Sequence, residues 1–320
     1  KENCYAYRVY SWWVKRFPLS EVSYINAGIG ATTSQFGVAR VHSDLLQYNP
    51  DMIFAEFSVN DSDNDKFQES FEGLISSILL YETNPGLMMF NNVEYDSGNN
   101  AQRVHNEVGI HYDLPIVSVK NSIYEEIATG NIEISEITPD NLHPNDYGHE
   151  LVAGLIINLL EKFYIEATSM VDTNVHMSYK LPKKPLTLNR YANSIRRNNL
   201  NSEASLNGFN KDLDIKEDWD VFRNGWTGSK KGSRISLKVE ASFISIQYKK
   251  YAKHPAPIAK ITIDGDKDNS VILDGNFDED WGDCLYLQDI MIAGEAGLHT
   301  VDIEIIEEAS GVNFYLASII

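Results

Sequence analysis

The spacing of apolar residues divides this chain into two halves of different character. Up to about residue 165, short apolar runs alternate with segments in which apolar residues recur with a helical period. This alternation is typical of a parallel sheet with crossover helices. From about residue 205 onward, every second residue tends to be apolar, as in Ile235, Leu237 and Val239. The second half is therefore predicted to be all-β.

The pattern also predicts the individual elements of the first half. Helices are expected over residues 5–17, 33–48, 66–81, 101–111, 122–128 and 146–164, and strands over residues 22–26, 52–57, 87–90 and 116–119. Residues 166–190 are polar and rich in Lys and Pro near their end, which suits a linker or a strap along the surface. The predicted organisation is an α/β domain over residues 1–165, this linker, and a β-sandwich over residues 191–320.

Composition and charge exclude several classes of partner. The 320 residues carry a net charge of −19, from 27 basic and 46 acidic side chains, so the protein's field repels nucleic acid and anionic membranes. No apolar run reaches the roughly 18 residues of a membrane span. Two distant cysteines, Cys4 and Cys284, do not resemble a secreted disulfide framework. We expect a cytoplasmic protein that binds neither nucleic acid nor membrane.

The strongest chemical signal is the segment Asp140-Asn141-Leu142-His143-Pro144, just before the last predicted helix. An Asp three residues before a His can hold one ring nitrogen while the other faces a nucleophile, as a general base requires. Alone, the segment fits a surface histidine at a helix start equally well.

A second segment, Asn26-Ala27-Gly28-Ile29-Gly30-Ala31-Thr32-Thr33, follows a predicted strand and leads into a helix. Gly30 is placed to present its backbone N–H at the helix N-terminus, where negative charge is stabilised. In isolation, a glycine-rich turn chosen for tight geometry is the simpler interpretation.

A third segment, Ser58-Val59-Asn60-Asp61, follows the apolar run 52–57. Ligands bind at the carboxyl ends of strands in open α/β sheets, so the Asn60 amide could donate to an oxyanion. Asp61 beside it is expected to contact the substrate. A simple Asx turn is an equally good interpretation of Asn60 taken alone.

Together these segments resemble the SGNH (GDSL-like) hydrolase family. Asn-x-Gly-x-Gly-x-Thr, Ser-Val-Asn-Asp and Asp-x-x-His-Pro occur in the family's order and approximate spacing across residues 1–165. The resemblance implies a three-layer α/β/α fold. It also implies that His143 is the base, Asp140 its orienting acid, and Gly30 and Asn60 the oxyanion donors.

One part of the family pattern is missing. The nucleophilic serine stands in a Gly-Asp-Ser or Gly-Gly-Ser turn after the family's first strand, and no such turn occurs in residues 1–320. We expect that serine, and the strand before it, to lie upstream of Lys1.

The second half resembles the jelly-roll-like β-sandwich of carbohydrate-binding modules. Trp281 lies in a loop with several acidic neighbours and is expected to contact a sugar ring, although packing in the core or within its own hairpin is as good an interpretation. The triplet Asp264-x-Asp266-x-Asp268 lacks the Gly and Glu of a calcium loop, so we expect a charged hairpin turn.

An SGNH domain joined to such a sandwich resembles two-domain carbohydrate acetyl esterases, including those that act on mannan. The resemblance implies a serine esterase that removes O-acetyl groups from a plant-type polysaccharide or oligosaccharide, with mannan-type favoured over xylan-type, and without a metal or organic cofactor. Two alternatives stay open: a lipase-like or thioesterase-like hydrolase, and a non-catalytic glycan-binding protein. The oligomeric state is not predicted.

Overall fold

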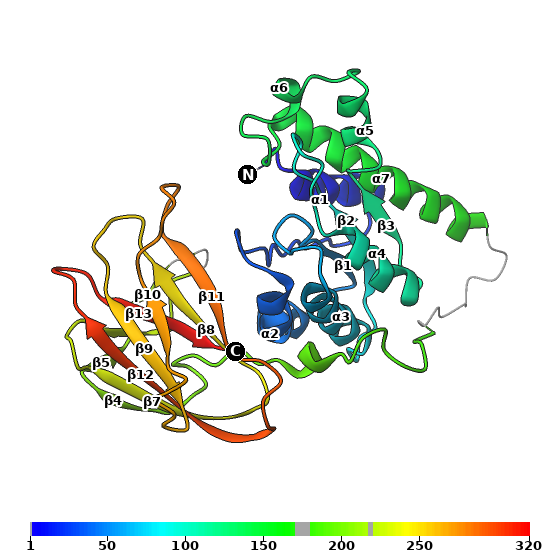
Figure 1. The fold of residues 1–320 in the computed structure, drawn as a ribbon. Helices are drawn as coiled ribbons and strands as arrows, with labels where there is room; N and C mark the ends of the chain where they lie inside the picture. The colour runs from blue at the N-terminus through cyan, green and yellow to red at the C-terminus, as the bar shows by residue number, and fades with distance from the viewer. Residues whose placement is uncertain (1, 170–179, 217–219) are drawn as a thin grey trace. The chain divides into compact units, whose positions relative to one another are not determined.

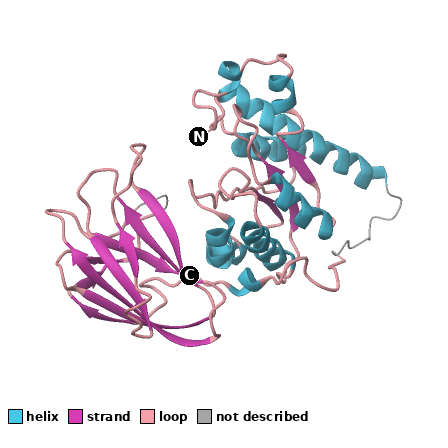
Figure 2. Ribbon diagram, in the orientation of Figure 1, coloured by secondary structure: helices cyan, strands magenta, loops and turns pink. Residues whose placement is uncertain are grey.

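The computed structural model describes residues 2–169, 180–216 and 220–320. They form two compact units, which we describe separately. The first covers the chain up to Gly28 together with Thr33–Asn193, and the second covers Ile29–Thr32 and Ser194–Ile320. Figure 2 shows the helices of the first unit and the strands of the second.

A parallel three-stranded sheet forms the centre of the first unit, in the order β1 (Met52–Ala55), β2 (Gly86–Asn91) and β3 (Ile116–Ser118). In register, Ala55 pairs with Met89 and Asn91 with Ser118. The helices are α1 (Tyr5–Arg16), α2 (Ser34–Asp44), α3 (Asp65–Leu79), α4 (Gln102–His111), α5 (Ile123–Ala128), α6 (Ile134–Ile137) and α7 (Asp146–Ser169), with a short 3-10 helix at Leu46–Tyr48.

The sheet lies between two helical layers, as the resemblance implied. Figure 1 shows α1 and α7 on one side of it and α2, α3 and α4 on the other. Met88 and Phe90 of β2 point toward α7 and pack with its buried stripe, which includes Val152 and Ile156. Because strands of a parallel sheet are covered on both faces, β2 is apolar almost throughout.

The strand expected over residues 22–26 does not form, and that prediction is wrong. Residues 21–29 have no regular secondary structure, and Tyr24 and Ile25 are exposed. A strand persists only beside a hydrogen-bonded neighbour, and none of the described residues pairs with the free edge of β1. Phe54 in β1 is accordingly 36% exposed.

The segment between the units follows α3 as a strap. The expected linker 166–190 begins within the last turn of α7, and residues 170–179 lie outside the described residues. Glu72 of α3, fully buried, accepts hydrogen bonds from the backbone N–H groups of Leu186 (2.6 Å) and Thr187 (2.7 Å). Glu69 holds Arg190 through two side-chain bonds of 2.8 and 2.7 Å. A 3-10 helix, η2 (Arg190–Asn193), ends the strap.

Two five-stranded antiparallel sheets form the second unit. Their orders are β10-β9-β12-β7-β4 and β11-β8-β13-β6-β5. The strands are β4 (Ala204–Asn207), β5 (Phe209–Lys211), β6 (Trp226–Gly228), β7 (Arg234–Ala241), β8 (Ile244–Lys250), β9 (Ile258–Ile263), β10 (Val271–Asp274), β11 (Cys284–Met291), β12 (Gly297–Glu307) and β13 (Phe314–Ile319).

Alternation along these strands places one face of each sheet in a shared core. Ile235, Leu237 and Val239 are buried with Trp226 and Leu316, as the period of two requires. The predicted all-β fold of this half is confirmed. None of the described helices of the chain is long and apolar enough to cross a lipid bilayer.

Candidate active site

Asp140 and His143 form a hydrogen-bonded pair on the loop before α7. His143 Nδ1 lies 2.8 Å from Asp140 Oδ2, and the backbone N–H groups of His143 (2.7 Å) and Leu142 (3.1 Å) donate to Asp140 Oδ1. These bonds, first the one from the His143 backbone and then the one from its ring, lower the pKa of Asp140 to about 2. The carboxylate is therefore ionised under all physiological conditions.

The loop around this pair is rigid because its backbone is bonded on both sides. Asn141 adopts a left-handed conformation, with φ of 68°, which asparagine tolerates better than most residues. Its carbonyl accepts from Tyr95 N at 2.7 Å, and Thr138 Oγ1 donates to the His143 carbonyl at 2.8 Å. These contacts hold the imidazole in one place while leaving its outer edge exposed.

His143 has the geometry of a general base awaiting a partner. Its side chain is 77% exposed, and Nε2 has no hydrogen-bond partner among the described residues. With Nδ1 held as a donor to Asp140, Nε2 is the acceptor nitrogen of the neutral ring. The pair can therefore accept a proton from an incoming hydroxyl at Nε2.

Asn60 lies in a short turn after β1, between Ser58 and Asp61, whose side chains are both hydrogen-bonded within the protein. The turn is closed by the Phe57 carbonyl, which accepts from Asn60 N (3.1 Å) and Asp61 N (2.9 Å). Ser58 is buried and donates through Oγ to Glu56 at 2.7 Å. The Asn60 side chain is exposed and has no hydrogen-bond partner among the described residues, so its amide is available to a ligand.

The Asn60 turn and the His143 loop are both bonded to the segment that follows β2. Ser58 Oγ also lies 3.0 Å from the Asn92 carbonyl oxygen, and Ala101 N donates to the Ser58 carbonyl at 2.7 Å. Three residues beyond Asn92, Tyr95 N donates to the Asn141 carbonyl. The structure thus brings both loops to the same carboxyl edge of the sheet, where parallel strands present ligand sites.

The expected substrate contact at Asp61 is corrected by the structure. Its side chain is fully buried, accepts from Ser34 N at 2.8 Å, and lies 3.0 Å from His105 Nε2. His105 is equally buried and stacks on Phe71 at a ring separation of 3.8 Å. Asp61 therefore anchors the Asn60 turn to the first turn of α2 and to α4, and does not face a substrate.

Gly30 does not lie at the start of α2 as expected. It precedes Ser34, the first residue of that helix, by four positions, and Ser34 N is already bonded to Asp61. Gly30 belongs to an exposed turn in which Thr32 Oγ1 donates to the Ile29 carbonyl at 2.7 Å, and Ile29–Thr32 group with the second unit. Its role as an oxyanion donor stays a prediction.

Trp281, the predicted sugar contact, is exposed on a loop of the second unit. Its side chain is not in the sandwich core: the residue is 55% exposed, its ring meets Phe277 edge-on at 5.0 Å, and Nε1 donates to Glu279 at 2.5 Å. This exposure excludes packing in the core, whereas the contact with Phe277 agrees with packing within its own loop, and the sugar contact stays a prediction. Asp264 and Gly265 form the turn between β9 and β10, both with positive φ, as expected of a hairpin.

No group of three His, Cys, Asp or Glu side chains in the described parts of the chain is arranged to hold a metal ion. The chemistry available at this edge of the sheet is that of a proton acceptor, an orienting carboxylate and an amide donor. This set matches acyl transfer to or from a hydroxyl.

Comparison with solved structures bears directly on this arrangement. A two-domain esterase (CEX) active on acetylated mannans, solved with mannopentaose, is 46% identical to this chain, with a TM-score of 0.93 over 99% of this chain and 84% of its own. A second structure of such an esterase gives 46% identity and a TM-score of 0.94, over 99% and 85% of the two chains. The chain belongs to this family of two-domain esterases.

Other comparisons add little to that assignment. No family model and no curated protein matches the chain. An acetyl xylan esterase, AlAXEase, is 19% identical with a TM-score of 0.43, over 50% of this chain and 92% of its own, a similarity too slight to bear on function.

Two positioning features of the esterase are not visible in its sequence. No motif in the sequence marks His105, and only the fold brings it against Asp61, forty-four positions away. Ser58 Oγ likewise donates to the nearby Glu56 and lies 3.0 Å from the carbonyl oxygen of Asn92, which is thirty-four positions away in the sequence. Asp61 is buried because it accepts from the backbone N–H of Ser34, the first residue of α2. The sequence pattern placed the start of this helix within one residue of Ser34.

Proposed function

We propose that the protein is a serine carbohydrate esterase that removes O-acetyl groups from a plant-type polysaccharide, with mannan-type favoured over xylan-type. The observation that carries this proposal is the His143–Asp140 pair, with Nδ1 and Oδ2 2.8 Å apart and Nε2 exposed. The substrate class is supported by the 46% identical esterase, which is active on acetylated mannans.

In the proposed reaction, a serine hydroxyl gives its proton to His143 Nε2 while its oxygen attacks the acetyl carbonyl carbon. Asp140 holds the ring and stabilises the imidazolium that forms. The amide of Asn60, with the backbone N–H of Gly30, stabilises the oxyanion. The C–O bond to the sugar then breaks, and the sugar oxygen takes the proton from His143. Water, activated by the same imidazole, releases acetate from the acyl-serine.

We further propose that the nucleophilic serine lies outside residues 1–320 and arrives on a strand paired with β1. The free edge of β1 and the exposure of Phe54 support this proposal, since parallel strands are ordinarily covered on both sides. The turn after such a strand would open at the same carboxyl edge as Asn60 and His143.

Replacement of the base tests the assignment. In the full-length protein, His143→Ala should lower kcat/KM for an aryl acetate by at least about 10³-fold, because general-base activation of the nucleophile is lost. His42→Ala is the matched control, since His42 is exposed on α2 and should leave the rate unchanged. Near-normal hydrolysis by His143→Ala would remove the triad assignment.

Acyl length separates the proposal from its alternatives. A sugar esterase should lose activity steeply between aryl acetate and aryl butyrate or octanoate, whereas a lipase-like enzyme prefers the longer chains. A glycan-binding protein would bind mannan oligosaccharides and release acetate from none of these substrates.

A further inference from the structure

Glu56 places a carboxyl group at the carboxyl end of β1, a few residues before Asn60. The Ser58 backbone N–H and the Ser58 hydroxyl both donate to Glu56 Oε1, at 2.8 and 2.7 Å. A third hydrogen bond comes from the backbone N–H of Asn92, the residue that follows β2. The carboxyl group therefore joins the turn after β1 to the segment after β2.

The carboxyl group of Glu56 is enclosed by the protein. Burial raises its pKa, although the bonds from Ser58 and Asn92 act in the opposite direction. Tyr5 of α1 lies near it, and burial and then the Glu56 carboxylate raise the pKa of this phenol. Enclosing an acid costs free energy unless hydrogen bonds or charges compensate it, so Glu56 occupies a place where most residues would be less costly.

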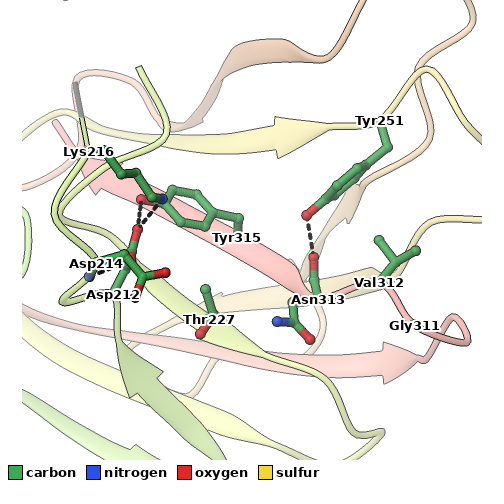
Figure 3. Close-up of a pocket in the computed structure, with 9 residues that line it drawn as sticks. All are labelled: Asp212, Asp214, Lys216, Thr227, Tyr251, Gly311, Val312, Asn313 and Tyr315. Atoms are coloured by element: carbon green, nitrogen blue, oxygen red, sulfur yellow. Dashed lines mark hydrogen bonds and ion pairs between the residues drawn. The ribbon is translucent and has the colours of Figure 1, made fainter. Parts of the chain in front are cut away.

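A buried carboxylate of the second unit shows the more usual form of compensation. Asp212 accepts from Lys216 Nζ and from Tyr315 OH, both at 2.7 Å, so a cation accompanies its charge (Figure 3). Among the described residues, no Lys or Arg lowers the pKa of Glu56 in this way. Since apolar side chains often replace buried charges without loss of stability, Glu56 is better explained by the groups that it holds in place.

Two carboxylates hold the turn that carries Asn60, one at each end. Asp61 ties the far end of the turn to α2 and α4. Glu56 ties the near end, at Ser58, to the segment after β2. The Asn60 side chain lies between these anchors, exposed and without a hydrogen-bond partner among the described residues. The position of its amide is therefore set by the backbone that the two anchors hold.

The segment after β2 also fixes the base. Tyr95, which is fully buried in this segment, donates its backbone N–H to the Asn141 carbonyl in the loop of His143 at 2.7 Å. Through Asn92, Glu56 thus links the turn after β1 to the same backbone that holds the imidazole loop. An oxyanion donor is effective only at about 2.7–3.1 Å from the developing charge, and a displacement of about 1 Å can lower a rate about 10²-fold.

We propose that Glu56 is a positioning residue of the esterase, which acts through Ser58 to hold the Asn60 amide at its working distance from the reacting carbonyl. The proposal rests on the proposed function, because it takes Asn60 as an oxyanion donor. Glu56 touches no reacting atom and transfers no proton. Its loss should therefore slow the reaction of bound substrate and leave substrate binding unchanged.

Steady-state kinetics of the full-length protein with an aryl acetate test this role. Glu56→Ala should lower kcat about 10- to 100-fold and leave KM within about twofold, because the amide is displaced and not removed. The variant should fold, since the Ser58 hydroxyl keeps an acceptor in the Asn92 carbonyl oxygen, 3.0 Å away. Ser58→Ala, which keeps the backbone bond to Glu56, should lower kcat by a smaller factor of at least about threefold.

A double-mutant cycle separates positioning from general destabilisation. In Asn60→Ala the amide is already absent, so adding Glu56→Ala should lower kcat by no more than about twofold further. Glu72→Gln is the matched control, because it changes another buried carboxylate of the first unit, one that holds the strap and not the turn. Its kcat should stay within about twofold of wild type at a temperature where both proteins are folded.

Two results would overturn the proposal: an unchanged kcat in folded Glu56→Ala, or an equal loss of kcat with and without the Asn60 amide. If Glu56→Ala does not fold, the cycle of Ser58→Ala with Asn60→Ala decides by the same criterion. Either result with an active wild type refutes the positioning role alone. A folded wild type that hydrolyses no aryl acetate refutes the esterase proposal, and the positioning role with it.

Discussion

The two oxygens of Asp140 perform different tasks. Oδ1 accepts from the backbone N–H groups of Leu142 and His143 and so shapes the loop, while Oδ2 accepts from His143 Nδ1 and so orients the base. An asparagine side chain can reproduce the first task but not the second, because its NH₂ group cannot accept from the ring.

We therefore expect Asp140→Asn to keep the fold and lose the rate. In the full-length protein, kcat/KM for an aryl acetate should fall about 10³- to 10⁴-fold, because the ring is no longer held in the tautomer with an acceptor Nε2. The melting temperature, measured in parallel, should change by no more than a few degrees. Activity within tenfold of wild type would contradict the orienting role of Asp140.

The depressed pKa of Asp140 also makes a prediction about pH. The pKa of Asp140 is about 2 in the folded protein, against about 3.9 for an Asp in an unfolded chain. Its stabilising contribution is thus fully present above about pH 4 and is lost as the pH falls toward 2. Between pH 4 and 7, Asp140 should therefore stay ionised and add no step of its own to log(kcat/KM). A step in this range that is absent from the residual activity of Asp140→Asn would contradict this prediction.

At the scale of an element, the turn after β1 separates function from stability in adjacent residues. Asn60 points outward without a partner among the described residues, whereas Asp61 is buried and bonds α2 and α4. Asn60→Ala should lower kcat about 10²- to 10³-fold, as loss of an oxyanion donor does, and leave the unfolding free energy unchanged.

Asp61→Ala should instead destabilise the fold by about 2–4 kcal/mol, because it leaves Ser34 N and His105 buried without their partner. Denaturant unfolding of both variants checks the contrast. If Asn60→Ala were the destabilising change and Asp61→Ala were neutral, the division of roles would be wrong.

Two buried carboxylates of α3, those of Glu69 and Glu72, hold the strap. Glu72 accepts from Tyr112 OH and from the backbone of Leu186 and Thr187. Glu72→Gln replaces an acceptor oxygen with a donor facing other donors, so unfolding should become easier by about 1–3 kcal/mol. Glu82→Gln, at an exposed position beyond α3, is the matched control in the same denaturant titration.

Most elements of this fold could be predicted from periodicity, because long amphipathic runs such as α3 and α7 depend on local sequence. The strand at residues 22–26 could not, since a strand requires a neighbour that no pattern within the segment provides. Asp140 and His143 are three positions apart, so their pairing was accessible from the sequence. The Asp61–His105 pair joins distant segments and was not.

At the scale of the whole molecule, each unit has its own apolar core. The core residues of the sandwich run from Phe209 to Ile319, and Arg197 at the start of this unit exchanges backbone hydrogen bonds with Ile319. We expect the fragment 194–320 to fold alone and to unfold cooperatively on heating, as small single domains do. If the amide resonances of the fragment showed the narrow chemical-shift dispersion of an unfolded chain, the expectation that it folds alone would be wrong.

Charge acts on the whole molecule as well. With a net charge of −19, a neutral polysaccharide approaches without repulsion, whereas a phosphorylated or uronic-acid-rich polymer does not. Among plant polysaccharides, neutral acetylated mannan satisfies this condition and is the polymer on which the 46% identical esterase acts.

The central claim is that the protein removes acetyl groups from such a polymer with His143 as its general base. Acetate release from acetylated mannan by the full-length protein tests this claim most directly. The wild type and His42→Ala should release acetate at equal rates, faster than from acetylated xylan, while His143→Ala should release it at least about 10³-fold more slowly. Equal release by His143→Ala, or none by a folded wild type, would contradict the account.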